Sequence, residues 1–178
     1  MVKRLALVVS AALAMAVPAA ADPIVIFNTG VDAVGAPLPG ASVDPHYSIV
    51  SGTPSYPGPT AWVASSFPGV WVANNTTSKW IAPDADATLE FGFGATFIYR
   101  TTFDLTGLVP ATASLSGLWA SDNQTLQILL NGVDTLVPPN CANSTADTGC
   151  FTSLHAFSIP VGSSFADGIN TLDFVVRN

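Results

Sequence analysis

Tryptophans are the side chains in this sequence best suited to recognition chemistry, because a flat indole can pack against the apolar face of a sugar ring. Trp71 and Trp80 flank a polar run at residues 74–77, which predicts that one of them is exposed. Trp119 shares a predicted strand face with Leu115 and is expected in the core. Core packing is the competing interpretation for each tryptophan, since indole rings are mostly well buried.

Two short polar motifs could supply hydrogen bonds beside such a ring. Asp44 and His46 stand in the motif Asp-Pro-His-Tyr within a proline-rich stretch, and Asp122 and Asn123 follow a predicted strand. An imidazole can both donate to and accept from sugar hydroxyls. The competing interpretation for the first pair is a local turn in which Asp44 fixes His46.

Acidic turn residues raise the question of a metal ion. Calcium binds six to eight oxygen ligands, and carboxylates near Asp84, Asp86 or Asp122 could provide some of them. Neither stretch matches the EF-hand loop, and aspartate and asparagine are also ordinary turn formers. The sequence leaves a structural calcium ion and a simple turn both open, and it predicts no other cofactor.

Catalytic motifs are not recognisable in this sequence. It has two histidines and a single glutamate, Glu90, and it lacks the Gly-x-Ser-x-Gly motif of a serine nucleophile. Glycosidases need two carboxyl groups on either side of a bond, and the scattered acids cannot be paired from spacing alone. We therefore expect a domain that is not an enzyme.

The two cysteines, Cys141 and Cys150, lie close together in the sequence. In an oxidising compartment such an isolated pair predicts a disulfide, and closing this loop would stabilise the fold by roughly 2–3 kcal/mol. A metal or redox pair is the alternative, but it lacks the Cys-x-x-Cys spacing and a nearby histidine.

The N-terminus has the pattern of a secretory signal over residues 1–21. Lys3 and Arg4 precede an apolar run at residues 5–17, and three alanines at residues 19–21 form a small-residue cleavage site. The run is short for a membrane span, which needs roughly 20 residues. The sequence therefore predicts export, cleavage and no membrane insertion of the mature chain, the alternative being an uncleaved anchor.

The mature chain, residues 22–178, is long enough for one domain with a sizeable core. Loss of the leader leaves three basic and twelve acidic residues, a net charge of −9. Such a chain has no positive surface for phosphate backbones or anionic lipid, so nucleic acid is excluded as an expected partner.

Alternation of apolar and polar residues predicts about nine short strands with turns between them. The clearest are residues 24–27, 47–50, 61–64, 96–105, 113–119, 126–130, 155–159 and 171–177. Prolines predict edge positions for the strands at 47–50 and 61–64, and Asn131-Gly132 predicts a hairpin turn. The expected fold is all-β, an antiparallel β-sandwich of the jelly-roll kind.

Several residue clusters, taken in order, resemble one known group of proteins. They are residues 28–31, 44–47, 71, 78–81, 99–105, 119–123, 131–132 and 168–174. The group is the small exported bacterial proteins of the PEP-CTERM type with a galactose-binding-like jelly-roll domain. The resemblance implies association with the cell envelope and exopolysaccharide. Members of the group continue past the position of Asn178 into a sorting motif, a membrane helix and a basic tail, so the sequence leaves open a truncation there.

Together these features predict a secreted or cell-surface domain that binds extracellular polysaccharide or a cell-envelope component. The residues expected to contact the ligand are Trp71, Trp80, Asp44, His46, Asp122 and Asn123. One alternative is a structural matrix protein without a discrete ligand, which would self-associate through an open strand edge at residues 174–178. Another is a polysaccharide-active enzyme or its accessory domain.

Overall fold

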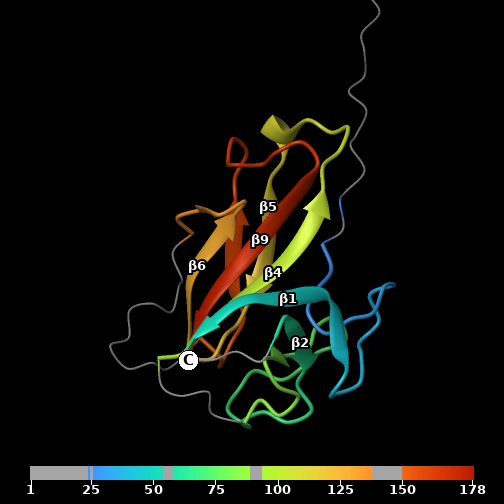
Figure 1. The fold of residues 1–178 in the computed structure, drawn as a ribbon, viewed down its shortest axis with the longest axis vertical. Helices are drawn as coiled ribbons and strands as arrows, with labels where there is room; N and C mark the ends of the chain where they lie inside the picture. The colour runs from blue at the N-terminus through green and yellow to red at the C-terminus, as the bar shows by residue number, and fades with distance from the viewer. Residues whose placement is uncertain (1–23, 25, 54–57, 89–93, 138–149) are drawn as a thin grey trace, which may run out of the picture.

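The computed structural model describes residues 24, 26–53, 58–88, 94–137 and 150–178, which Figure 1 shows in colour. Within them the chain forms nine β-strands and one short 3-10 helix, and no α-helix. The strands are β1 (Val43–Thr53), β2 (Thr60–Val63), β3 (Ile81–Ala82), β4 (Thr96–Asp104), β5 (Leu115–Trp119), β6 (Gln124–Leu130), β7 (Val133–Asp134), β8 (His155–Ile159) and β9 (Ile169–Arg177); the 3-10 helix η1 is Pro110–Thr112. The all-β expectation is confirmed.

Seven strands form one antiparallel sheet in the order β3-β2-β1-β4-β9-β6-β7, and β5 pairs with β8 in a second sheet. The central strands β4 and β9 run side by side along their whole length, from Thr96 opposite Arg177 to Asp104 opposite Ile169 (Figure 1). Strand positions predicted from residue 96 onward agree with β4, β5, β6, β8 and β9. The alternation of apolar and polar residues predicted these strands because each of them buries one face.

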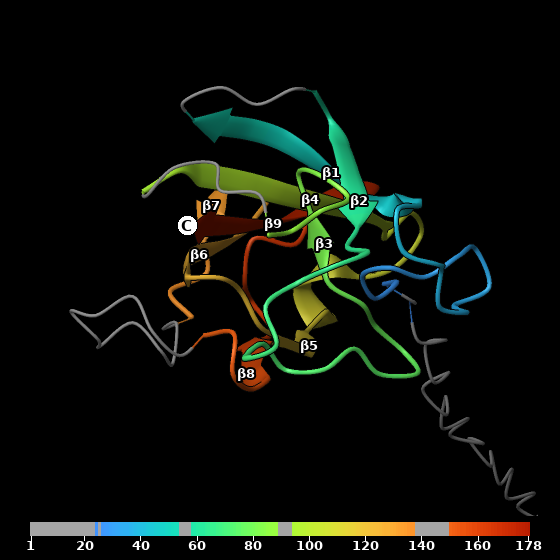
Figure 2. The ribbon, with the colours of Figure 1, turned by 90° about the horizontal axis from the view of Figure 1, so that it is seen from below.

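Side chains from both sheets share one buried core. Phe103, Leu130 and Leu172 come from the large sheet, and Trp119 and Ile159 from the small one. Burying each of the aliphatic side chains stabilises the fold by roughly 1.5–3 kcal/mol. The small sheet therefore covers part of one face of the large sheet, with β5 and β8 lying beneath β4 and β9 in Figure 2.

A second, smaller core lies under the other half of the large sheet. Ile49, Ala61, Ala95 and Phe97 form its buried part, and Tyr47, Ile81 and Tyr99 pack against them. The two cores are separate clusters, so the face of the large sheet is not covered uniformly along its width.

The strand expected at residues 24–27 is not present at the positions that the structure describes there. Ile26 packs against the larger core, and the Phe27 ring stacks on His46 with 3.9 Å between ring centroids. Side-chain packing, and not ladder pairing, therefore holds this segment.

The edge positions expected from proline are wrong, because β1 lies between β2 and β4, and β2 lies between β1 and β3. Pro45 is tolerated since pairing of β1 with β4 begins only at Ser48, and pairing with β2 is irregular between Val43 and Ser48. No ladder bond is needed from the missing N–H there.

The open edge expected at residues 174–178 is also wrong. Residues 174–177 pair with β4 on one side and with β6 on the other. The strand β9 is thus interior to the sheet, and it offers no edge for self-association.

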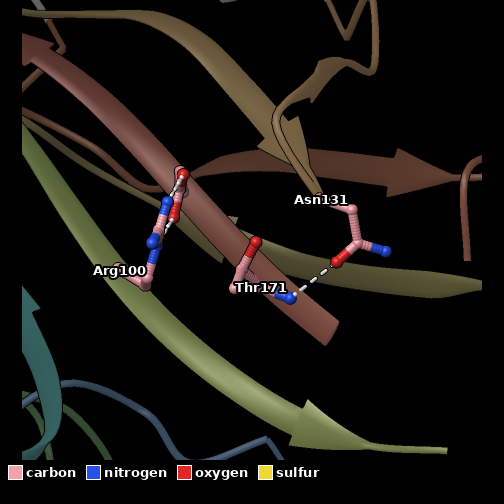
Figure 3. Close-up of polar contacts among 4 residues, drawn as sticks. Arg100, Asn131 and Thr171 are labelled. Atoms are coloured by element: carbon pink, nitrogen blue, oxygen red, sulfur yellow. Dashed lines mark hydrogen bonds and ion pairs between the residues drawn. The ribbon is translucent and has the colours of Figure 1, made fainter. Parts of the chain in front are cut away.

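The Asn131-Gly132 turn is confirmed as the β6–β7 hairpin. Both residues have positive φ, 53° and 78°, as a type I′ turn requires. Asn131 Oδ1 accepts a hydrogen bond from the backbone N–H of Thr171 at 2.9 Å (Figure 3), and its Nδ2 donates to Asn170 Oδ1 and Ser164 O at 2.8 Å each. The turn side chain thereby joins the hairpin to β9.

The predicted signal, residues 1–21, and Cys141 lie outside the described residues. Cys150 is 1% exposed and belongs to the larger core. The disulfide between the two cysteines stays a prediction.

Candidate functional site

A cleft of about 360 Å³ lies on the covered face of the large sheet, and we call it the aromatic cleft. It is lined by members of both core clusters, including Phe97 and Tyr99 from one and Trp119 and Phe174 from the other. Its aromatic lining residues are Tyr47, Trp71, Trp80, Phe97, Tyr99, Trp119 and Phe174. Its volume is within the range of small-molecule sites, about 300–1,000 Å³.

Residues 71–80, the tryptophan loop, contribute much of the cleft wall. Asparagine side chains hold this loop in shape. Asn74 Oδ1 accepts a hydrogen bond from the backbone N–H of Trp80 at 2.8 Å, and Asn75 Oδ1 accepts from the backbone N–H of Thr77 and Ser78 at 2.7 and 2.8 Å. These amides therefore serve as turn formers.

Backbone bonds tie the tryptophan loop to two distant segments. The Val72 N–H donates to Phe151 O at 2.6 Å, and the Lys79 N–H donates to Thr29 O at 2.9 Å. Thr29 Oγ1 donates in return to Lys79 O at 2.7 Å. The wall is thus anchored at both ends before any ligand is present.

The predicted stacking residues, Trp71 and Trp80, both line the cleft and contact each other, with 4.5 Å between centroids and a tilt of 48°. Trp80 Nε1 donates to Val72 O at 2.7 Å, so its polar atom is used within the loop. Trp71 is half-buried, and its other neighbour is Phe67, stacked at 5.9 Å. The half-buried rings of both tryptophans therefore form part of the cleft wall, and Trp71 has aromatic contacts with Phe67 and with Trp80.

Asp122 also lines the cleft and is half-buried. Burial raises the pKa of this carboxyl above its ordinary value. Beside it, Thr125 Oγ1 donates to Ser121 Oγ at 3.1 Å, and both hydroxyl residues are buried. Asn123 is not among the lining residues, and its N–H donates to Arg177 O at 2.8 Å.

The structure places Asp44 and His46 outside the cleft lining. Asp44 is 3% exposed and accepts backbone N–H bonds from Gly30 at 2.6 Å, His46 at 2.8 Å and Tyr47 at 3.0 Å. His46 Nε2 hydrogen bonds to Asp32 O at 2.9 Å. This geometry fits the turn interpretation of the motif.

Tyr47, which follows that motif, does line the cleft. Its hydroxyl donates to Phe27 O at 3.2 Å. Burial, and then the charge of Asp44, raise the pKa of Tyr47 well above its ordinary value, so the phenol stays neutral.

The acidic turn considered for calcium is held by its own hydrogen bonds. Asp84 Oδ1 accepts from the Asp86 N–H at 2.9 Å, and Asp86 Oδ1 accepts from Ser66 Oγ and Thr88 Oγ1 at 2.6 Å each. The hydrogen bonds from Ser66, first, and from Thr88 lower the pKa of Asp86. Among the described residues no three histidine, cysteine or acidic side chains gather as metal ligands, and Glu90 lies outside those residues. Calcium binding stays a prediction.

Sequence reasoning missed several lining residues, above all Tyr47, Tyr99, Lys79 and Asn28. Tyr99 follows Phe97 by two residues on β4, and this strand period could have placed it on the same covered face. Tyr47 lies on β1, whereas Lys79 and Asn28 lie in loops. Tertiary contacts bring these three residues to the cleft, and no local signal marks them.

Comparison of the chain with family models, with curated proteins and with solved structures finds no match. The resemblance to PEP-CTERM-type proteins therefore remains an expectation from the residues that carry it. In the part of the chain that the structure describes, no helix has the length and hydropathy needed to cross a membrane.

Proposed function

We propose that this protein is a non-catalytic carbohydrate-binding domain, exported from a bacterial cell, whose ligand is a polysaccharide of the extracellular matrix or cell envelope. The observation that carries the proposal is the aromatic cleft of about 360 Å³, with Trp71 partly exposed at its wall. Sugar rings combine an apolar face with a hydroxyl edge, and such a ligand needs aromatic and polar groups side by side.

The lining of the cleft provides both kinds of group. The Trp71 ring can stack on a sugar face, while Asp122 and the exposed Asn28 offer hydrogen-bonding atoms. The anchored tryptophan loop supports this role, because a wall that is ordered beforehand loses little conformational entropy on binding.

The distribution of acids supports a role in binding over hydrolysis. Acid–base cleavage of a glycosidic bond generally uses two carboxyl side chains on either side of that bond. Among the described residues, Asp122 is the only acidic side chain that lines the cleft.

For the fold, we propose a β-sandwich of the galactose-binding jelly-roll kind. The core cluster shared by the seven-stranded and two-stranded sheets supports this assignment. Two antiparallel sheets that bury their facing side chains together define a sandwich.

The test is binding of the purified exported protein to a panel of polysaccharides and oligosaccharides, with and without a calcium chelator. Trp71→Ala should weaken binding about tenfold, or about 1.4 kcal/mol. Trp62→Ala is the matched control, because Trp62 is half-buried on β2 and does not line the cleft. No binding by folded protein would refute the function, and binding unchanged by Trp71→Ala would remove the cleft from it.

A further inference from the structure

Lys79 is the only basic side chain among the described residues that line the aromatic cleft. Its backbone is held on both sides, since its N–H donates to Thr29 O at 2.9 Å and its carbonyl accepts from Thr29 Oγ1 at 2.7 Å. Gly30 lies so close that a β-carbon built there would be 2.6 Å from Lys79 Cβ. The lysine side chain therefore starts from a fixed point at the cleft.

The other cations outside the predicted signal are engaged elsewhere. Arg100 forms an ion pair with Asp173, and Arg177 donates to Gln124 at 3.1 Å. Both arginines alternate with Tyr99, Phe174 and other cleft residues along β4 and β9, which places them on the opposite face of the sheet.

Lys79 forms no ion pair with an acidic residue within the described ranges. The chain nevertheless has twelve acidic and five basic residues, a net charge of −7. Lys79 is half-buried, and a cation at a cleft attracts an anion more strongly than one in open water, because the local dielectric is lower.

We infer that the cleft binds acidic sugars of the uronic-acid class, with Lys79 contacting the sugar carboxylate while Trp71 stacks on the ring. This inference rests on the proposed carbohydrate-binding function and adds the charge of the ligand to it. The negative charge of the whole chain repels polyanions at long range, so the preference arises from contact at the cleft.

The test uses calorimetric titration with oligomers of galacturonate, glucuronate and mannuronate, each paired with its methyl ester. Esterification removes the charge and leaves the ring in place. The wild-type protein should bind at least one acid about tenfold more tightly than its ester in low salt, and added salt should reduce the difference.

Lys79→Gln should bring the acid and its ester to the same affinity, and Lys79→Arg should retain the preference. Arg177→Gln is the charge-matched control, because it removes one positive charge from the opposite sheet face and should leave the preference intact. Equal thermal midpoints would show that the variants fold alike.

Equal affinity for acid and ester in the wild type, or a preference that survives Lys79→Gln, would overturn the inference. If neutral oligosaccharides still bind in a Trp71-dependent manner, the proposed function stands and only the acidic ligand class is refuted. If no oligosaccharide or polysaccharide binds, both proposals fall together.

Discussion

The Arg100–Asp173 ion pair joins the two central strands of the large sheet (Figure 3). Arg100 Nε and Nη2 donate to the two carboxylate oxygens of Asp173 at 2.7 Å each. The side chain of Asp173 is 4% exposed, whereas that of Arg100 is 36% exposed. The guanidinium therefore covers the carboxylate. Removal of Arg100 and removal of Asp173 should lower the free energy of unfolding by different amounts.

Of single changes to the two partners, Arg100→Met should be the more damaging, because it leaves a buried carboxylate without its cation. Breaking a fully buried pair in this way costs about 3–5 kcal/mol. Since the Arg100 side chain is about a third exposed, water can partly replace the guanidinium, and we expect about 2–3 kcal/mol. Asp173→Asn keeps the shape and one acceptor and leaves Arg100 able to reach water, so about 1–1.5 kcal/mol is expected.

The double variant Arg100→Met/Asp173→Leu removes both charges and should recover to within about 1 kcal/mol of wild type. Urea unfolding of the four proteins measures these differences, provided that the slope with denaturant stays constant. The proposed sugar binding should be unchanged in these variants, because the pair lies on the face opposite the aromatic cleft. A cost below about 0.5 kcal/mol for Arg100→Met, or a smaller cost than for Asp173→Asn, would refute the covering role of Arg100.

Three further predictions concern Asp44, Gly117 and Asp122. Asp44→Ala removes the acceptor of three backbone N–H groups and should lower the free energy of unfolding in urea by about 3 kcal/mol. A loss under about 1 kcal/mol would contradict the role of Asp44 in the turn. Gly117→Ala places a β-carbon 2.6 Å from Phe157 Cε1 and should cost about 1–3 kcal/mol, whereas Gly69→Ala, with nothing within 4 Å, is the neutral control. Burial raises the pKa of Asp122 above its ordinary value of 3.8, because the folded protein favours the protonated carboxyl. The contribution of this protonated group to the free energy of unfolding is therefore complete below pH 3.8 and is lost as the pH rises through the folded pKa. Unfolding measured across this pH range should show Asp122→Asn gaining stability relative to wild type as pH rises, and a constant difference would contradict the shift.

The strands β4, β5, β6, β8 and β9 could be predicted because their alternation of apolar and polar residues is local. The Asn131-Gly132 turn was equally local, since both residues tolerate positive φ. Predictions about edges failed, because the position of a strand in a sheet depends on partners far away in the sequence. The prolines before Ser48 could not reveal that β1 pairs with β4, because this pairing begins only at Ser48.

By itself, the sequence determined the all-β class, most strand positions and the hairpin turn, because these follow from side-chain period and backbone preference within a few residues. Only the tertiary structure decided that Trp71, Trp80 and Trp119 line one cleft and which polar residues lie beside them. Trp71 and Asp122 line one cleft, while Asp44 is enclosed by backbone N–H groups elsewhere. The physical reason is that the cleft arises between two cores, whose members come from strands paired across long separations in the chain.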